Sequence, residues 1–269
     1  LDFLSKLVAP DIAVITMIGE AHIEFFGTRD KIADAKMEIT HGLSEDGIIV
    51  YNGDEPLLRD RTANLNLRKR TFGQRETTDL FATNIEATST STSFTTNLWP
   101  DKSFTIPMIG TYNVNNALAA LSVANVYRIR PENAQKALAA VNLTENRAEW
   151  VKGTVGEDIL SDVYNSNPTA VKQVLAAFSQ TPVVGKRYAV LGDMLELGTQ
   201  ADAMHADVAS AIDPDKISHI YLVGSHMIAL QKRLAQEKPD LPVTHFNSKS
   251  LPALTLALQD ILPADAQIL

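Results

Sequence analysis

The stretch IAVITMIGEAHIEFFGTRDKIADAKMEI, Ile12–Ile39, combines the signals of a buried strand, a polar loop and a helix. Its apolar, β-branched opening, Ile12–Ile18, predicts a strand buried on both faces. Helical spacing follows in a second set of apolar residues, namely Ile32, Ala35, Ile39 and Leu43. His22 lies in the loop between them, and Lys36 borders the apolar stripe of the helix. Open α/β sheets place ligand sites in such loops, so this stretch predicts an α/β fold and a candidate site.

Spacing alone leaves the roles of these two residues open. A histidine in a loop is more often a surface group than a ligand. A lysine at the edge of an apolar stripe usually extends its ammonium into water. From spacing alone, His22 and Lys36 can therefore be either ordinary surface residues or parts of a site.

The composition favours a globular protein. The chain has 269 residues, 45% of them apolar and 21% charged, which allows one large domain or two ordinary ones. No apolar run is long enough to cross a bilayer, and there is no cysteine to form a disulfide. We therefore expect a cytoplasmic protein without membrane insertion. The net charge of −8 argues against nucleic acid as a partner.

The order of patterns predicts two different folding regions. Alternating residues between Leu80 and Ile109 predict antiparallel strands that form a small sheet of their own. After residue 150, apolar strands alternate with helical segments, as at Lys186–Gly192, Ile217–Gly224 and Val243–Phe246. This spacing predicts a doubly wound, Rossmann-like parallel sheet. No G-x-G-x-x-G motif occurs, so a dinucleotide cofactor is not expected.

Four further segments carry polar residues beyond what local structure needs. Asn113, Asn115 and Asn116 precede the helical run at residues 117–124, although capping explains only one asparagine. The other three segments are NRAE at residues 146–149, DVYNSNP at 162–168 and GDMLELG at 192–198. Locally, Arg147 beside Glu149 is an exposed ion pair of little energetic worth. An aspartate at position 162 is about as compatible with a turn or cap as with a site.

Together, these segments resemble the Mur ligases, the ATP-dependent amide-bond ligases of cell-wall precursor synthesis. The resemblance implies that His22 binds Mg²⁺ and that Lys36 carries a carbamate supporting the metal site. It further implies that Asn113 and Asn116 hold the adenine of ATP and that Arg147 reaches its γ-phosphate. The sequence departs from the family at position 112, where a tyrosine stands in place of a frequent histidine.

The resemblance extends to substrates. It implies that Asp162 binds the ribose of ATP and that Asn165 and Asn167 face the incoming amino acid. The GDMLELG segment is typical of the family member that adds D-alanyl-D-alanine to UDP-N-acetylmuramoyl-tripeptide. These two compounds are the expected partners, joined through an acyl phosphate by a monomeric enzyme. His205, on the helix that follows, is expected to pack or cap.

The resemblance also predicts the domain organisation. Residues 1–146 correspond to a central, ATP-binding domain and residues 147–269 to a C-terminal domain that closes onto it. No phosphate loop of the G-x-x-G-K-[S/T] type occurs, and the family places that loop upstream of Leu1. We therefore expect a fragment that is inactive alone and truncated at its end. The alternatives are another Mur or folylpolyglutamate synthase ligase, or a non-catalytic nucleotide-binding protein of the same fold.

Overall fold

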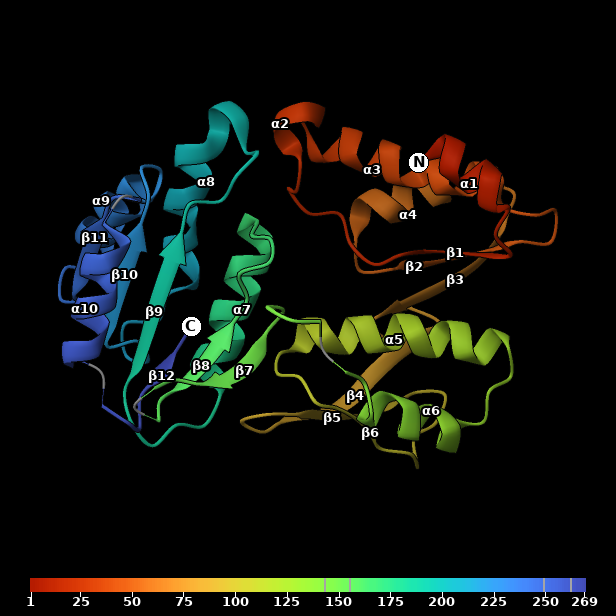
Figure 1. Cartoon of the computed structure of the whole chain (residues 1–269). Coiled ribbons are helices and arrows are strands. Elements are labelled where there is room, and N and C mark those ends of the chain that lie inside the picture. Colours follow the sequence, from red (N-terminus) through yellow and green to blue (C-terminus); the bar gives the residue numbers. More distant parts are fainter. Residues whose placement is uncertain (143, 155, 249, 262) are drawn as a thin grey trace. The chain divides into compact units, whose positions relative to one another are not determined.

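The computed structural model describes residues 1–142, 144–154, 156–248, 250–261 and 263–269. The chain divides into two compact units (Figure 1). The first unit contains Leu1–Gly19, Phe26–Ala87 and Ser91–Val141, and the second contains Glu20–Phe25, Thr88–Thr90 and Asn142–Leu269. The domain boundary predicted after residue 146 stays a prediction.

One six-stranded sheet forms the centre of the first unit. Its strands follow the chain order: β1 (Ile12–Ile15), β2 (Ile48–Asn52), β3 (Arg68–Gly73), β4 (Leu80–Ala87), β5 (Thr92–Thr96) and β6 (Phe104–Ile106). The strands β1 to β4 pair in parallel, and β5 and β6 add antiparallel pairs.

The antiparallel strands predicted between Leu80 and Ile109 are confirmed, but they extend the parallel sheet and do not stand apart, because β4 also pairs with β3. Phe72 of β3 pairs with Leu80 of β4, and both side chains are buried in one apolar cluster. A strand that shares its core with a neighbour gains more by pairing with it than by standing apart.

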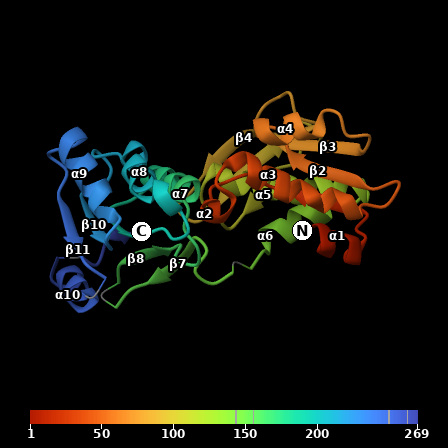
Figure 2. The same ribbon diagram turned by 90° about the horizontal axis from the view of Figure 1, so that it is seen from above.

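Helices cover both faces of this sheet. Figure 1 shows α5 (Thr111–Val126) and α6 (Pro131–Ala139) on one face, and α3 (Arg29–Met37) and α4 (Pro56–Thr62) on the other. The view from above in Figure 2 shows the same elements. The helix α5 buries Val114, Leu118 and Leu121 in the apolar cluster of the sheet. Burial of each such side chain stabilises the fold by about 1.5–3 kcal/mol.

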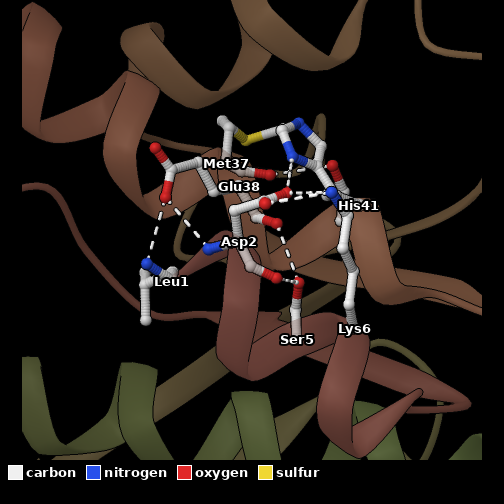
Figure 3. Close-up of polar contacts among 8 residues, drawn as sticks. Leu1, Asp2, Ser5, Lys6, Met37, Glu38 and His41 are labelled. Carbon is white, nitrogen blue, oxygen red and sulfur yellow. Dashed lines mark hydrogen bonds and ion pairs between the residues drawn. The ribbon is translucent and has the colours of Figure 1, made fainter.

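The first helix, α1 (Asp2–Val8), is fastened to the 3₁₀ turn η1 (Glu38–Gly42) that follows α3. His41 Nδ1 lies 2.7 Å from the carboxylate of Asp2, and the Ser5 hydroxyl donates to the Glu38 carbonyl at 3.1 Å (Figure 3). Gly42 permits this close approach, because a Cβ there would lie 2.0 Å from the Ser5 carbonyl oxygen. Glycine is thus required where the two segments meet.

A second six-stranded sheet forms the centre of the second unit. Its spatial order is β11-β10-β9-β12-β8-β7. The strands are β7 (Glu149–Lys152), β8 (Asp158–Ser161), β9 (Arg187–Gly192), β10 (His219–Val223), β11 (Val243–Phe246) and β12 (Gln267–Ile268). All of them pair in parallel except β7, which is antiparallel to β8. The α/β class and the doubly wound arrangement predicted for this region are confirmed.

The helices of the second unit follow the strands in the predicted alternation. They are α7 (Pro168–Gln180), α8 (Ala201–Asp207), α9 (Met227–Glu237) and α10 (Leu251–Ile261), with the 3₁₀ turns η2 (Gly198–Gln200) and η3 (Val208–Ala211). The four-residue helix α2 (Ile23–Phe26) lies in the loop after β1. In the part of the chain that the structure describes, none of the helices is long and apolar enough to cross a membrane.

Candidate functional site

Lys36 points its ammonium at the end of the first strand. The residue lies in the last turn of α3, and its Nζ donates a hydrogen bond to the Met17 carbonyl at 2.8 Å. Burial lowers the pKa of the Lys36 ammonium below its usual value. The lysine therefore does not simply extend into water, and its neutral amine is more accessible than that of a surface lysine.

A second cation of the same helix holds the same loop. Arg29 donates to the Ile18 carbonyl at 2.8 Å and to the Glu55 carboxylate at 2.9 Å. Glu55 is the N-cap residue of α4, where its carboxylate accepts from the Leu57 backbone N–H. Arg29 thus connects the end of β1 with α3 and α4. Its importance was missed from the sequence, because its partners are a backbone carbonyl and a distant cap.

The asparagines at the start of α5 have different environments. Asn113 is buried, its Nδ2 donates to the Ile109 carbonyl at 2.9 Å, and its Oδ1 accepts from Asn116 Nδ2 at 3.2 Å. Asn116 is exposed. The structure therefore brings these two residues together, with Asn113 holding the side chain that faces solvent.

A residue at the end of β3 joins this group. The Gln74 side chain donates to the Thr111 carbonyl at 3.1 Å, and its backbone N–H donates to the Asp54 carboxylate at 2.6 Å. Gln74 also lies 3.4 Å from Asn115 Oδ1. Sequence reasoning missed Gln74, although a polar residue directly after a strand was the available signal.

Arg147 lies on the second unit, over the ring of Tyr164. Its guanidinium carbon is 4.1 Å from the ring centroid, a cation–π geometry. The loop around it is fastened to the end of β8, since the Tyr164 N–H donates to the Asn146 carbonyl at 3.2 Å. The Glu149 carboxylate accepts from the Asn146 N–H instead of pairing with the arginine. Arg147 itself is exposed, so its charge is available to a ligand.

Asp162 lies beside this arginine at the carboxyl end of β8. Its Oδ1 accepts from the Ala148 N–H at 3.0 Å, so it is in part a loop-fastening residue. Burial raises the pKa of the Asp162 carboxyl, although that hydrogen bond and the Arg147 charge oppose the shift. The structure thus brings together Asp162 and Arg147, which are fifteen positions apart in the sequence.

A cavity of about 230 Å³ opens beside Asp162 at the carboxyl ends of β8 and β9. Its wall includes apolar side chains of α7 and both sheet strands, and its polar groups come from Asp162, Ser166 and Asp193. The crevice at the carboxyl ends of parallel strands is the usual ligand position in a doubly wound sheet.

The two other asparagines predicted for substrate binding differ in their surroundings. Asn167 is the N-cap residue of α7, where its Oδ1 accepts from the Ala170 N–H at 3.0 Å. This bond leaves its amide N–H groups for other partners. Asn165 is exposed in the loop.

His22 precedes α2 in a left-handed backbone conformation, with φ of 64°. Its side chain is exposed. Within the described ranges, no cluster of three or more histidine, cysteine or acidic side chains is arranged to hold a metal ion. The Glu196 carboxylate contacts His22 Nδ1, so the described residues place one carboxylate beside this histidine.

Comparison with known families gives two matches that together span most of the chain. The Mur ligase middle domain matches residues 2–124, and the Mur ligase glutamate ligase domain matches residues 146–269. The second match contains Arg147, Asp162 and the cavity beside them.

Two curated relatives carry the same description. Over 224 residues, the chain is 38% identical to UDP-N-acetylmuramoyl-tripeptide–D-alanyl-D-alanine ligase from Bacillus subtilis, which covers 83% of the chain and 48% of that protein. The Escherichia coli protein of the same name is 30% identical over 241 residues, covering 87% of the chain and 53% of that protein. The chain thus spans about half the length of the curated relatives it matches.

A solved structure supports the same assignment. A crystal structure described as MurF from Acinetobacter baumannii superposes with a TM-score of 0.83 and 27% sequence identity. The match covers 99% of the chain and 57% of that structure.

Proposed function

Because the chain belongs to the Mur ligase family, we propose that the full-length protein joins D-alanyl-D-alanine to UDP-N-acetylmuramoyl-tripeptide at the expense of ATP. The observation that carries this proposal is the 38% identity to the Bacillus subtilis enzyme of that description. The GDMLELG segment at residues 192–198 supports the same acceptor, because it is typical of the family member that adds D-alanyl-D-alanine, and its first two residues, Gly192 and Asp193, line the cavity beside Asp162.

The proposed reaction has two steps. A carboxylate oxygen of the tripeptide attacks the γ-phosphorus of ATP, and ADP leaves with the electrons of the broken P–O bond. The neutral amine of D-alanyl-D-alanine then attacks the carbonyl carbon of the acyl phosphate. Inorganic phosphate leaves from the tetrahedral intermediate, and the amine loses its proton as the amide forms. Each step separates or joins strongly charged groups, so electrostatic stabilisation is the main demand on the protein.

The segment matched by the Mur ligase middle domain supplies groups suited to a metal-supporting carbamate and to the base of ATP. Lys36 fits a carbamate because burial lowers the pKa of its ammonium, and carbon dioxide reacts with the neutral amine. His22 and the Lys36 carbamate would hold Mg²⁺, which supplies charge screening for phosphoryl transfer. Asn116 would contact the adenine, and Asn113 would fix the orientation of its amide.

The second unit supplies groups for the remainder of the nucleotide and for the acceptor. The exposed guanidinium of Arg147 is suited to phosphate oxygens, because it stays charged and donates two parallel hydrogen bonds. Asp162 would accept from the ribose hydroxyls. Asn165 and Asn167 would face the acceptor, Asn167 through amide N–H groups that its capping bond leaves available.

The test is phosphate release by the full-length protein with ATP, Mg²⁺ and UDP-N-acetylmuramoyl-tripeptide. Release that depends on D-alanyl-D-alanine and not on single amino acids supports the proposal. Release that depends on a single amino acid, such as glutamate, would instead indicate another ligase of the superfamily. A folded protein that binds ATP but releases no phosphate with any acceptor would favour a binding role.

Variants then connect the activity with the site. Arg147→Ala is expected to lower kcat/KM by about 10²–10³, the usual effect of removing one group that stabilises transition-state charge. Arg130→Ala is the matched control, because Arg130 is exposed at the start of α6 and makes no side-chain cap hydrogen bond there. Unchanged turnover in Arg147→Ala would contradict the role given to this arginine.

A further inference from the structure

His205 is a fully buried histidine that the proposed reaction does not use. It lies in α8 with no exposed surface, and it contacts the segment Gly192–Gly198 that follows β9. We call this segment the β9 loop. Gly192 and Asp193 of the β9 loop line the cavity beside Asp162. A residue that fixes this loop therefore fixes one wall of the cavity.

The contacts of His205 determine the position of its proton. The Met194 backbone N–H points at Nε2 at 2.8 Å, and the Ala201 carbonyl oxygen lies 2.7 Å from Nδ1. An N–H group can only donate, so Nε2 must be an unprotonated acceptor. A carbonyl oxygen can only accept, so Nδ1 must carry the hydrogen. The ring is thus neutral, in one of its two tautomers.

The β9 loop is also held at Asp193 and at Glu196, whose carbonyl accepts from the Glu24 N–H at 2.9 Å and whose carboxylate contacts His22. The Asp193 N–H donates to the Val223 carbonyl at 3.1 Å, and its Oδ1 accepts from the Met227 N–H at 3.1 Å. At Gly224 the carboxyl carbon of Asp193 lies 2.3 Å from where a Cβ would stand, so this contact is tight. His205 is the group that fixes the following residue, Met194, whose side chain is also buried.

We propose that His205 is a positioning residue that holds the β9 loop at Met194 through its neutral Nδ1–H tautomer, and that protonation of its ring releases the loop at this residue. A second hydrogen on Nε2 would face the Met194 N–H, which is itself a donor. The hydrogen bond would be lost, and a buried N–H would have neither this partner nor water.

The surroundings of the ring favour the neutral form. Burial lowers the pKa of the His205 imidazole, and the hydrogen bond to the Ala201 carbonyl and the charges of Asp193 and Asp202 oppose this shift. His226 faces the ring as a stacked neighbour, with centroids 5.3 Å apart, and adds to the lowering. Its Nδ1 lies 2.7 Å from Asp202 Oδ1, so this carboxylate pairs with His226 while its charge also acts on His205.

The first experiment reads the tautomer and the loop directly in the 269-residue chain. Nitrogen-15 NMR of the labelled histidine should show the Nδ1–H form of His205 at neutral pH. Hydrogen exchange should show a protected Met194 amide. Its protection factor should fall as the pH is lowered, by up to about tenfold per pH unit once the ring begins to titrate. An Nε2–H tautomer, or Met194 protection that does not change across the His205 titration, would overturn the proposal.

Two variants separate positioning from simple packing. In His205→Gln, the side chain can accept from the Met194 N–H and donate to the Ala201 carbonyl but cannot titrate, so protection should persist and become independent of pH. In His205→Phe, the ring volume stays but both hydrogen bonds are lost, so protection should fall at every pH. The matched control is His226→Gln, which should leave the Met194 amide protected at neutral pH. Equal protection in the Phe and Gln variants would show packing alone and overturn the proposal.

A kinetic measurement extends the test to the full-length protein, and this part rests on the proposed function. The KM for D-alanyl-D-alanine should rise as the pH falls in the wild type, and His205→Gln should remove that part of the rise while leaving kcat nearly unchanged. If the NMR and hydrogen-exchange results are as expected but the KM for D-alanyl-D-alanine is the same in the wild type and in His205→Gln, the link between the β9 loop and the acceptor is contradicted. They would leave the positioning role supported.

Discussion

Replacing Asn113 with alanine is expected to destabilise the first unit, although the residue belongs to a predicted nucleotide-binding motif. Its Nδ2 donates to the Ile109 carbonyl, and both residues are buried. A buried acceptor that loses its hydrogen bond costs about 1–3 kcal/mol. The bond to the exposed Asn116 adds little, so we expect a loss of about 2 kcal/mol in unfolding free energy.

Asn113→Asp distinguishes the donor from the shape of the side chain. The substitution keeps the size and places an oxygen opposite the Ile109 carbonyl oxygen. Two acceptors would face each other, and at neutral pH a charge would be buried, so the loss should exceed that of the alanine variant. Asn116→Ala is the matched control, because this side chain is exposed and its removal should change stability by less than about 0.5 kcal/mol.

Urea unfolding followed by tryptophan fluorescence can report on the first unit alone. Trp99 packs 5.8 Å from the Phe104 ring in that unit, and Trp150 lies in the second. A Trp150→Phe background therefore leaves Trp99 as the reporter. The reasoning would be refuted if Asn113→Ala unfolded at the same urea concentration as Asn116→Ala.

Three further predictions concern other parts of the molecule. With labelled bicarbonate, NMR should show a carbamate carbon signal that grows as the pH rises from about 7 to 9. Burial lowers the pKa of Lys36, so more of its neutral amine forms over this range. A signal that persists in Lys36→Arg would refute this prediction. Burial raises the pKa of Asp162, so its contribution to stability is lost as the pH rises through the ordinary value of 3.8 toward the folded value. Asp162→Asn should thus melt at a slightly higher temperature at neutral pH, while nucleotide affinity measured by calorimetry falls about tenfold or more; equal affinity would contradict the ribose role. Gly42→Ala should cost about 1–3 kcal/mol in unfolding free energy because of the contact with Ser5, whereas Gly192→Ala, whose Cβ would meet nothing within 4 Å, should be nearly neutral at the urea midpoint.

The sequence by itself determined the type and order of the elements, because the periodicity of apolar residues is a local property. The stretch Ile12–Ile39 predicted a strand, a loop and a helix, and the structure has β1 and α3 there. The segment Asn167-Pro168 likewise marked the start of α7, since an asparagine cap and a first-turn proline act through adjacent backbone groups. The motifs that identify the family are local in the same sense.

The tertiary structure decided which strands are neighbours and what each polar residue does. Strand β12 inserts between β8 and β9, and β4 extends the parallel sheet, because strand pairing depends on residues far apart in the chain. Within one asparagine-rich segment, burial separates Asn113 from the exposed Asn116. The neutral tautomer of His205 also depends on two partners that only the fold brings to its ring. The periodicity of apolar residues does not show which distant segments will bury a given polar side chain. Those segments supply its hydrogen-bond partners, and burial shifts its pKa, so both depend on the tertiary structure.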